Sequence, residues 1–216
     1  MTKGFQHDVA KLLLSRLDSY GFALSGGLAL SELGLTNRPT KDIDLFTSSF
    51  DKDLFDKAVS EALATLQQTG YKAVLSRKTD TFARLEIDYS NECLSVDLGY
   101  DYREYDTVKT DIGYVANKKD VILNKVSALY ARALPRDYID VSNILMSGEM
   151  TGAELLRLSK ERDEGFVPEF FIAALRKVWT FDYEDFCEYG ISKEACDDMK
   201  ITISAWADEI EKAQTV

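Results

Sequence analysis

The chain has 216 residues, 45% of them hydrophobic and 29% charged, a composition typical of a globular protein with a sizeable core. Its net charge of −11 disfavours a broad, non-specific grip on nucleic acid, which depends on cationic side chains that release phosphate counterions. No segment approaches the roughly 18 apolar residues of a membrane span, and the N-terminal residues lack the apolar core of a signal peptide. Three cysteines and one histidine argue against a disulfide framework or a zinc site. We therefore expect a cytoplasmic protein with no membrane segment.

The first part of the chain mixes helical and strand patterns. Apolar residues at helical spacing predict a helix over 5–19 that ends before Gly21. A short strand, a short helix ending at Gly34 and a turn-rich loop follow. Strand alternation at 41–47 then gives way to a long amphipathic helix capped by Ser or Asp and ended by Gly70. Period-two patterns predict three further strands, the last two joined by a turn at 89–91, over 71–77, 81–89 and 92–100.

From about residue 118 the pattern is helical throughout. Helices are predicted over 118–134 and from Pro135, and Thr151 with Glu154 forms a capping box for the next one. Pro168 begins another helix, and a final helix or helix pair covers 192–213. The pattern predicts an α+β fold, with a mixed β-sheet and flanking helices over residues 1–116. A C-terminal helical bundle over 117–216 is expected to pack on this core.

Two aspartates interrupt an otherwise apolar strand in "KDIDLF". On a strand, Asp42 and Asp44 project to the same face, where two like charges repel and a sheet gains nothing from them. The pair makes sense if a divalent cation lies between the carboxylates and a ligand, and magnesium prefers such oxygen donors. Asp97 in "LSVDLGY" is a third carboxylate among apolar residues. If its strand is adjacent, three carboxylates converge and can hold two magnesium ions for phosphoryl-type transfer.

The alternative is structural. Asp42 would be a turn residue, Asp44 would face solvent and Asp97 would pair with a nearby arginine such as Arg84; the spacing alone does not choose between these interpretations. Asp88 competes for the third position, although it lies beside the predicted turn, whereas Asp97 is flanked by apolar residues.

Gly26 and Gly27 lie where a short strand passes into a helix. Glycine there permits close approach of the backbone to a ligand, the first helical N–H groups attract phosphate, and Ser25 adds a hydroxyl. Taken alone, such a pair more often marks a plain tight turn. The segment is neither a Walker P-loop, because the Lys-Ser/Thr ending is missing, nor a dinucleotide fingerprint, because the third glycine is absent.

The chain contains, in order, a strand, a Gly-Gly pair, a short helix, a loop and the Asp-Ile-Asp strand. This combination resembles the signature of the DNA polymerase β-type nucleotidyltransferase superfamily. The segment "GGLALSELGLTNRPTKDIDLF" is similar in particular to the AbiEii/AbiGii-type toxin family. A second block, "LNKVSALYARALPRDYIDV", resembles the lysine and Arg-Asp-x-x-Asp pattern of the same family. The resemblance covers roughly residues 20–145, and it implies the nucleotidyltransferase type of mixed sheet.

The resemblance implies roles for particular residues. Gly26 and Gly27 would bind the triphosphate of an NTP, and Asp42, Asp44 and Asp97 would bind magnesium. Lys125 would contact the nucleotide's phosphates, with Asp137 and Asp140 near it. A solvated lysine and a helix-start charge pair are the alternatives for these helical residues. Arg38 and Lys41, on either side of the loop before the aspartates, would meet phosphate oxygens or remain surface charges. Three tyrosines follow Asp97, namely Tyr100, Tyr102 and Tyr105. They would either stack on a base or lie in the core or at its rim.

The implied activity is magnesium-dependent transfer of a nucleotidyl group from an NTP to an acceptor hydroxyl, with release of pyrophosphate. The family resemblance points to a toxin of a bacterial toxin–antitoxin (abortive infection) pair, with an antitoxin as partner and RNA such as tRNA or a protein as acceptor. Because the net charge is negative, a small-molecule acceptor such as an aminoglycoside remains an alternative. A non-catalytic relative that only binds nucleotide is the remaining alternative.

Overall fold

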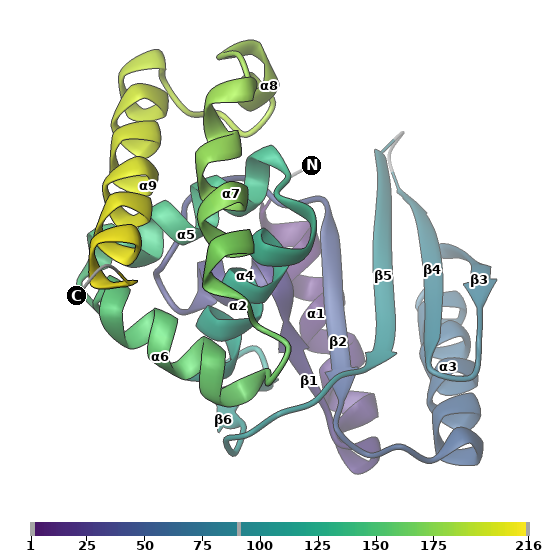
Figure 1. Ribbon diagram of the computed structural model, residues 1–216. Helices are drawn as coiled ribbons and strands as arrows, with labels where there is room; N and C mark the ends of the chain where they lie inside the picture. The colour runs from purple at the N-terminus through teal and green to yellow at the C-terminus, as the bar shows by residue number, and fades with distance from the viewer. Residues whose placement is uncertain (1–2, 90–91, 215–216) are drawn as a thin grey trace. The chain divides into compact units, whose positions relative to one another are not determined.

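The computed structural model describes residues 3–89 and 92–214, which form two compact units (Figure 1). The first unit comprises Met1–Ala29 and Thr40–Asp120, and the second comprises Leu30–Pro39 and Val121–Val216. The strands are β1 (Phe22–Ser25), β2 (Asp42–Thr47), β3 (Lys72–Lys78), β4 (Phe82–Tyr89), β5 (Glu92–Tyr100), β6 (Val108–Lys109) and β7 (Tyr114–Val115). The helices are α1 (Lys3–Leu17), α2 (Gly26–Glu32), α3 (Lys52–Gln68), α4 (Lys118–Arg132), α5 (Pro135–Ser147), α6 (Gly152–Arg162), α7 (Pro168–Arg176), α8 (Glu184–Cys187) and α9 (Lys193–Gln214). Short 3-10 helices lie at η1 (Asp18–Tyr20) and η2 (Lys177–Thr180).

A seven-stranded mixed sheet organises the first unit, in the order β3-β4-β5-β2-β1-β7-β6. The β2–β5 and β1–β7 pairs are parallel, and the other neighbours are antiparallel. The parallel β2–β5 pair joins segments that are distant in the chain, because α3, β3 and β4 lie between these strands in sequence. The aspartates of two distant segments are thereby brought to adjacent strands.

Alternation along the central strands separates an apolar face from a polar one. Ile43 and Leu45 on β2 and Val96 and Leu98 on β5 are fully buried, as the period of two requires for a sheet covered on one side. Helices α1 and α3 pack against each other and against the sheet (Figure 1). Asp51 caps the start of α3 by accepting a hydrogen bond from the backbone N–H of Leu54. The polar residues of the same strands are left on the opposite face.

The second unit is helical, with its own core of aromatic contacts. Phe171 of α7 meets Trp206 of α9 edge-on with ring centroids 5.1 Å apart. The buried Tyr138 of α5 donates its hydroxyl hydrogen to the carbonyl of Ala174 at 2.7 Å. Thr151 and Glu154 form the predicted capping box of α6. Within residues 3–89 and 92–214, no helix has both the length and the apolar character needed to cross a membrane.

The predicted α+β fold class is confirmed, and most predicted helices and strands occur within a few residues of their expected bounds. The sequence patterns missed β6 and β7, whose two-residue strands are too short to show alternation, as well as the four-residue α8. The predicted turn at 89–91 lies mostly outside the described residues. Asp42 is the first residue of β2 rather than part of a turn, and Asp44 lies on a central strand rather than an edge strand.

Candidate active site

Four polar side chains form a row across the polar face of the sheet in the first unit. Ser25 pairs with Asp44, Asp44 pairs with Asp97, and Asp97 pairs with Arg84, across β1, β2, β5 and β4. Residues in register on adjacent strands project from the same face, so the four side chains are neighbours. We call these four residues the aspartate row.

Asp42 shares this face because it lies two residues before Asp44 on β2. It pairs in register with Ser95 of β5, whose hydroxyl donates to a carboxylate oxygen of Glu86 on β4 at 2.8 Å. The backbone carbonyl of Asp42 accepts a hydrogen bond from the buried side chain of Gln6 at 2.8 Å, which ties this end of β2 to α1. The face therefore carries acids on three neighbouring strands.

Gly26 places the start of α2 directly against Asp44. Its φ of +65° lies in the left-handed region, which L side chains rarely adopt. A Cβ at this position would also overlap the Asp44 carboxylate. Gly26 is thus required both by its backbone conformation and by the close approach of the aspartate. Gly27 follows it as the second residue of α2, and Ser25 is buried at the end of β1.

Arg84 and Asp97 form a bidentate ion pair. The Nε of Arg84 lies 2.6 Å from Oδ1 and its second terminal nitrogen lies 2.7 Å from Oδ2. This hydrogen bonding raises the pKa of Arg84, burial opposes the rise, and the charges of Asp97, Asp42 and Glu86 add to it. The pairing of Asp97 with Arg84 is the contact that the structural alternative anticipated. The placement of Asp97 beside Asp44 is the one that the metal hypothesis anticipated.

The carboxylates fit magnesium in their donor chemistry. Asp42, Asp44 and Asp97 offer hard oxygen donors on one face of adjacent strands, as Mg²⁺ prefers. Among the residues that the structure describes, however, no three His, Cys, Asp or Glu side chains are drawn together closely enough to hold a metal ion. Both oxygens of Asp97 are engaged by Arg84. Asp42 and Asp44 would therefore be the first ligands, and Asp97 would join them on releasing Arg84.

The predicted cationic residues of the second unit converge on one buried carboxylate. Asp140 of α5 is fully buried, with Arg38 bound to both of its oxygens at 2.6 and 2.7 Å and the Lys125 Nζ 2.9 Å from Oδ2. Burial favours the neutral acid, but hydrogen bonds and charge from Arg38 and Lys125 outweigh it and lower the pKa of Asp140. Arg38 and Lys125 are both about 8% exposed, so neither is the solvated surface cation of the alternative interpretation.

Asp137 has a different environment from Asp140. It is fully buried, binds Arg132 through both oxygens at 2.8 and 2.9 Å, and accepts from the backbone N–H of Leu134 at 3.1 Å. The last contact caps the first turn of α5, which begins at Pro135. In the structure described here, Asp137 stabilises a helix start and pairs with Arg132 rather than with Arg136.

Sequence reasoning did not single out Glu86 and Ser95, which lie on the face of the carboxylates, or Gln6, which binds the backbone carbonyl of Asp42. The alternation of Arg84, Glu86 and Asp88 along "FARLEIDY" predicts that these side chains share one face of β4. That this face is also the face of Asp44 depends on the β4–β5–β2 pairing, which the local pattern does not specify.

The mixed sheet with its flanking helices is a fold that the chain shares with solved structures. A crystal structure of a candidate nucleotidyltransferase from Helicobacter pylori matches with a TM-score of 0.59 at 15% identity, covering 99% of each chain. The structure of JHP933 from the same organism matches with a TM-score of 0.55 at 16% identity, covering 100% of this chain and 97% of the other. At these identities the likeness concerns the fold.

The sequence profile of the nucleotidyltransferase AbiEii toxins of type IV toxin–antitoxin systems matches residues 12–195. The chain belongs to this family, and the resemblance drawn from its motifs is confirmed. No curated protein matches the chain in sequence.

Proposed function

We propose that the aspartate row, together with Asp42, is the catalytic centre of a magnesium-dependent reaction that transfers a nucleotidyl group from an NTP to an acceptor hydroxyl. The observation that carries the proposal is the register of Asp44 beside Asp97 on parallel strands, with Asp42 on the same face. Magnesium, when bound, would lower the pKa of the acceptor hydroxyl and stabilise the leaving pyrophosphate. Asp42 and Asp44 are the residues that hold it.

The turn at Gly26 and Gly27 receives the triphosphate. Glycine at the close approach to Asp44 leaves no side chain between the start of α2 and the carboxylates. The N–H groups of the first helical turn have no partners within the helix and donate to phosphate oxygens. The buried hydroxyl of Ser25, next to Asp44 in register, is a further donor.

Asp97 acts as the general base. It accepts the proton of the acceptor hydroxyl; the oxygen then forms a bond to the α-phosphorus, and the bond from that phosphorus to the pyrophosphate oxygen breaks. The ion pair with Arg84 occupies both oxygens of Asp97, so proton transfer requires Arg84 to release one of them. Arg84 would then be free to bind phosphate.

The family places the enzyme in a toxin–antitoxin system, and we propose that the acceptor is an RNA such as tRNA or a protein of the host cytoplasm. A small hydroxyl-bearing molecule is the second candidate acceptor. It is favoured by the net charge of −11, which opposes broad contact with a polyanion.

Labelling of a whole-cell extract separates these acceptors. The purified enzyme is incubated with each of the four α-labelled NTPs, magnesium, and either total RNA, total protein or a panel of small hydroxyl compounds including aminoglycosides. We expect label in the RNA or the protein fraction, abolished by EDTA. Label in small molecules alone would favour the second acceptor. Binding of NTP without label in any fraction would indicate a non-catalytic relative.

A further inference from the structure

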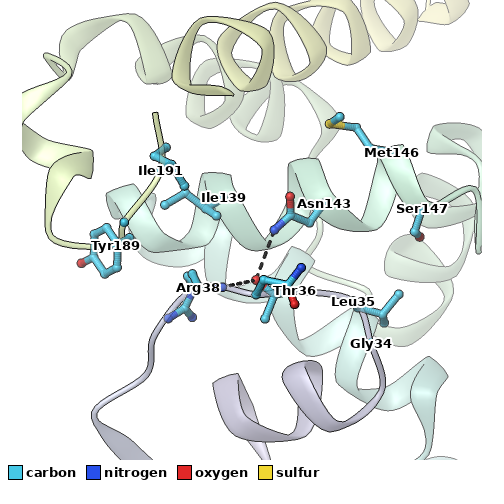
Figure 2. A pocket seen from close by; sticks show the side chains of 12 residues that line it. Gly34, Leu35, Thr36, Arg38, Ile139, Asn143, Met146, Ser147, Tyr189 and Ile191 are labelled. Carbon is cyan, nitrogen blue, oxygen red and sulfur yellow. Dashed lines mark hydrogen bonds between the residues drawn. The ribbon is translucent and has the colours of Figure 1, made fainter. Parts of the chain in front are cut away.

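A pocket of 390 Å³ lies within the second unit, a volume typical of small-ligand sites (Figure 2). Its walls come from three segments: the loop after α2, the exposed side of α5, and the turn between α8 and α9. The proposed transfer chemistry makes no use of most of its lining residues.

An aromatic ring and apolar side chains shape this pocket. Tyr189 lies with its ring centroid 5.8 Å from the guanidinium carbon of Arg38, a cation–π distance. Both oxygens of Asp140 hold the guanidinium of Arg38, so the group that contacts the Tyr189 ring has a fixed position. Ile139 and Ile191 lie near Tyr189 in Figure 2 and supply apolar surface. Such walls suit a planar ring.

One amide group gives the pocket a polar edge. The side-chain nitrogen of Asn143 donates to the buried Thr36 hydroxyl at 3.1 Å, which fixes the orientation of the amide (Figure 2). The amide oxygen points away from Thr36 in the same view. An asparagine amide held in this way presents hydrogen-bonding groups of the kind that recognise the edges of nucleobases.

The charges at the pocket favour a neutral ligand. None of the described residues that line it is acidic, and their single charged side chain, Arg38, is offset by Asp140. Three of the five N–H donors of Arg38 are directed at Asp140 and the Pro39 carbonyl. The lining residues offer no carboxylate to a metal ion, and the pairing of Arg38 with Asp140 weakens its attraction for a phosphate.

We propose that this pocket binds a nucleobase, with its ring against Tyr189 and its hydrogen-bonding edge toward Asn143. Nucleobases are planar, neutral rings with hydrogen-bonding groups along their edges. A nucleotidyltransferase encounters them either in its NTP or in a nucleic-acid acceptor. The proposal depends on the nucleotidyltransferase family and not on the aspartate row.

Direct binding of the four ribonucleosides, without magnesium, tests the proposal by calorimetry. We expect saturable binding of at least one nucleoside. Tyr189→Leu should weaken it about tenfold or more, the effect of losing one base–aromatic stack. Met146→Trp at the pocket rim should also block it, and because Met146 is 65% exposed, this change leaves the core intact. Ile201→Trp, at a site 61% exposed and outside the pocket lining, is the matched control and should bind normally.

The absence of saturable binding by any of the four nucleosides, or equal binding by Met146→Trp and the wild type, would overturn the proposal. If the NTP of the preferred base binds more tightly than the nucleoside, the base comes from the donor. If a short RNA ending in that base binds more tightly, it comes from the acceptor. Nucleosides carry no phosphate, so this test can succeed or fail independently of nucleotidyl transfer.

Discussion

The guanidinium of Arg84, on the strand next to that of Asp97, donates hydrogen bonds to both carboxylate oxygens of Asp97, at 2.6 and 2.7 Å. The carboxylate that would complete the metal site is thus already balanced by a cation. The side chain of Arg84 is 40% exposed and that of Asp97 is 10% exposed, so the pair is partly screened by solvent. A magnesium ion bound at Asp97 would therefore compete with Arg84 for the same oxygens.

Replacing Arg84 with glutamine should tighten magnesium binding, because Asp97 is released and the face becomes more negative. We expect a gain of up to about fivefold, the worth of a partly exposed ion pair. Calorimetric titration with MgCl₂ measures it. Arg77→Gln is the matched control, because Arg77 is opposite Arg84 on β3 and its loss removes the same charge without freeing Asp97. Weaker magnesium binding by Arg84→Gln than by the wild type would refute the competition.

Gly26→Ala should abolish nucleotidyl transfer out of proportion to its effect on stability. The new methyl group meets the Asp44 carboxylate and also strains the backbone at φ +65°. The strain alone costs on the order of 1–3 kcal/mol of unfolding free energy. Gly70→Ala is the control, since Gly70 also has a positive φ, of +90°, but a Cβ there finds no atom within 4 Å. Pyrophosphate release and urea unfolding are measured for both variants. Equal activity of the two would show that Gly26 does not position Asp44.

Asp140→Asn should destabilise the protein strongly, because it leaves two buried cations, Arg38 and Lys125, without their charge partner. Loss of one partner of a buried pair costs about 3–5 kcal/mol of unfolding free energy. Asp208→Asn, which breaks an exposed pair with Arg176 at 3.0 Å, should cost less than about 1 kcal/mol. Chemical denaturation compares them. Similar losses in both variants would mean that the Asp140 cluster contributes no more than a surface pair.

The same cluster predicts a pH dependence. The pKa of Asp140 is lowered in the folded state, because Arg38 and Lys125 outweigh the effect of burial. The unfolded chain therefore takes up the proton first, at the ordinary pKa of 3.8, and the stabilisation is complete above that value. It is lost as the pH falls through the lower, folded-state pKa. The stability difference between the wild type and Asp140→Asn should be constant at neutral pH and shrink below about pH 4. A difference that grows on acidification would contradict the assignment.

Local patterns predicted the elements that carry the site but not how they pair. The alternation in "DIDLF" and "LSVDLGY" was sufficient to predict that Asp42, Asp44 and Asp97 lie on strands. The register of Asp44 beside Asp97 arises because β2 pairs with β5 and not with β3, the next strand in sequence. Such a parallel pairing is decided by the whole sheet.

Burial of charged residues was equally difficult to predict. Arg38 lies in a loop with Asn, Pro and Thr, a composition typical of the surface, yet it is buried because Asp140, 102 residues later, binds it. Lys125, for which a solvated position was the alternative, is also buried, and its ammonium group pairs with the same Asp140. The sequence contained the correct residue types, but their partnership depends on tertiary packing.

The effect of Asp44→Asn on nucleotidyl transfer tests the account most directly. The variant keeps the size of the side chain and removes the charge at the centre of the aspartate row. We expect kcat/KM for pyrophosphate release to fall by at least about 100-fold, as for other groups that stabilise developing charge. Asp88→Asn, at an exposed position on β4, should remain within about twofold of the wild type, with circular dichroism confirming the fold of both. Wild-type kcat/KM in Asp44→Asn would contradict the assignment of this row as the catalytic centre.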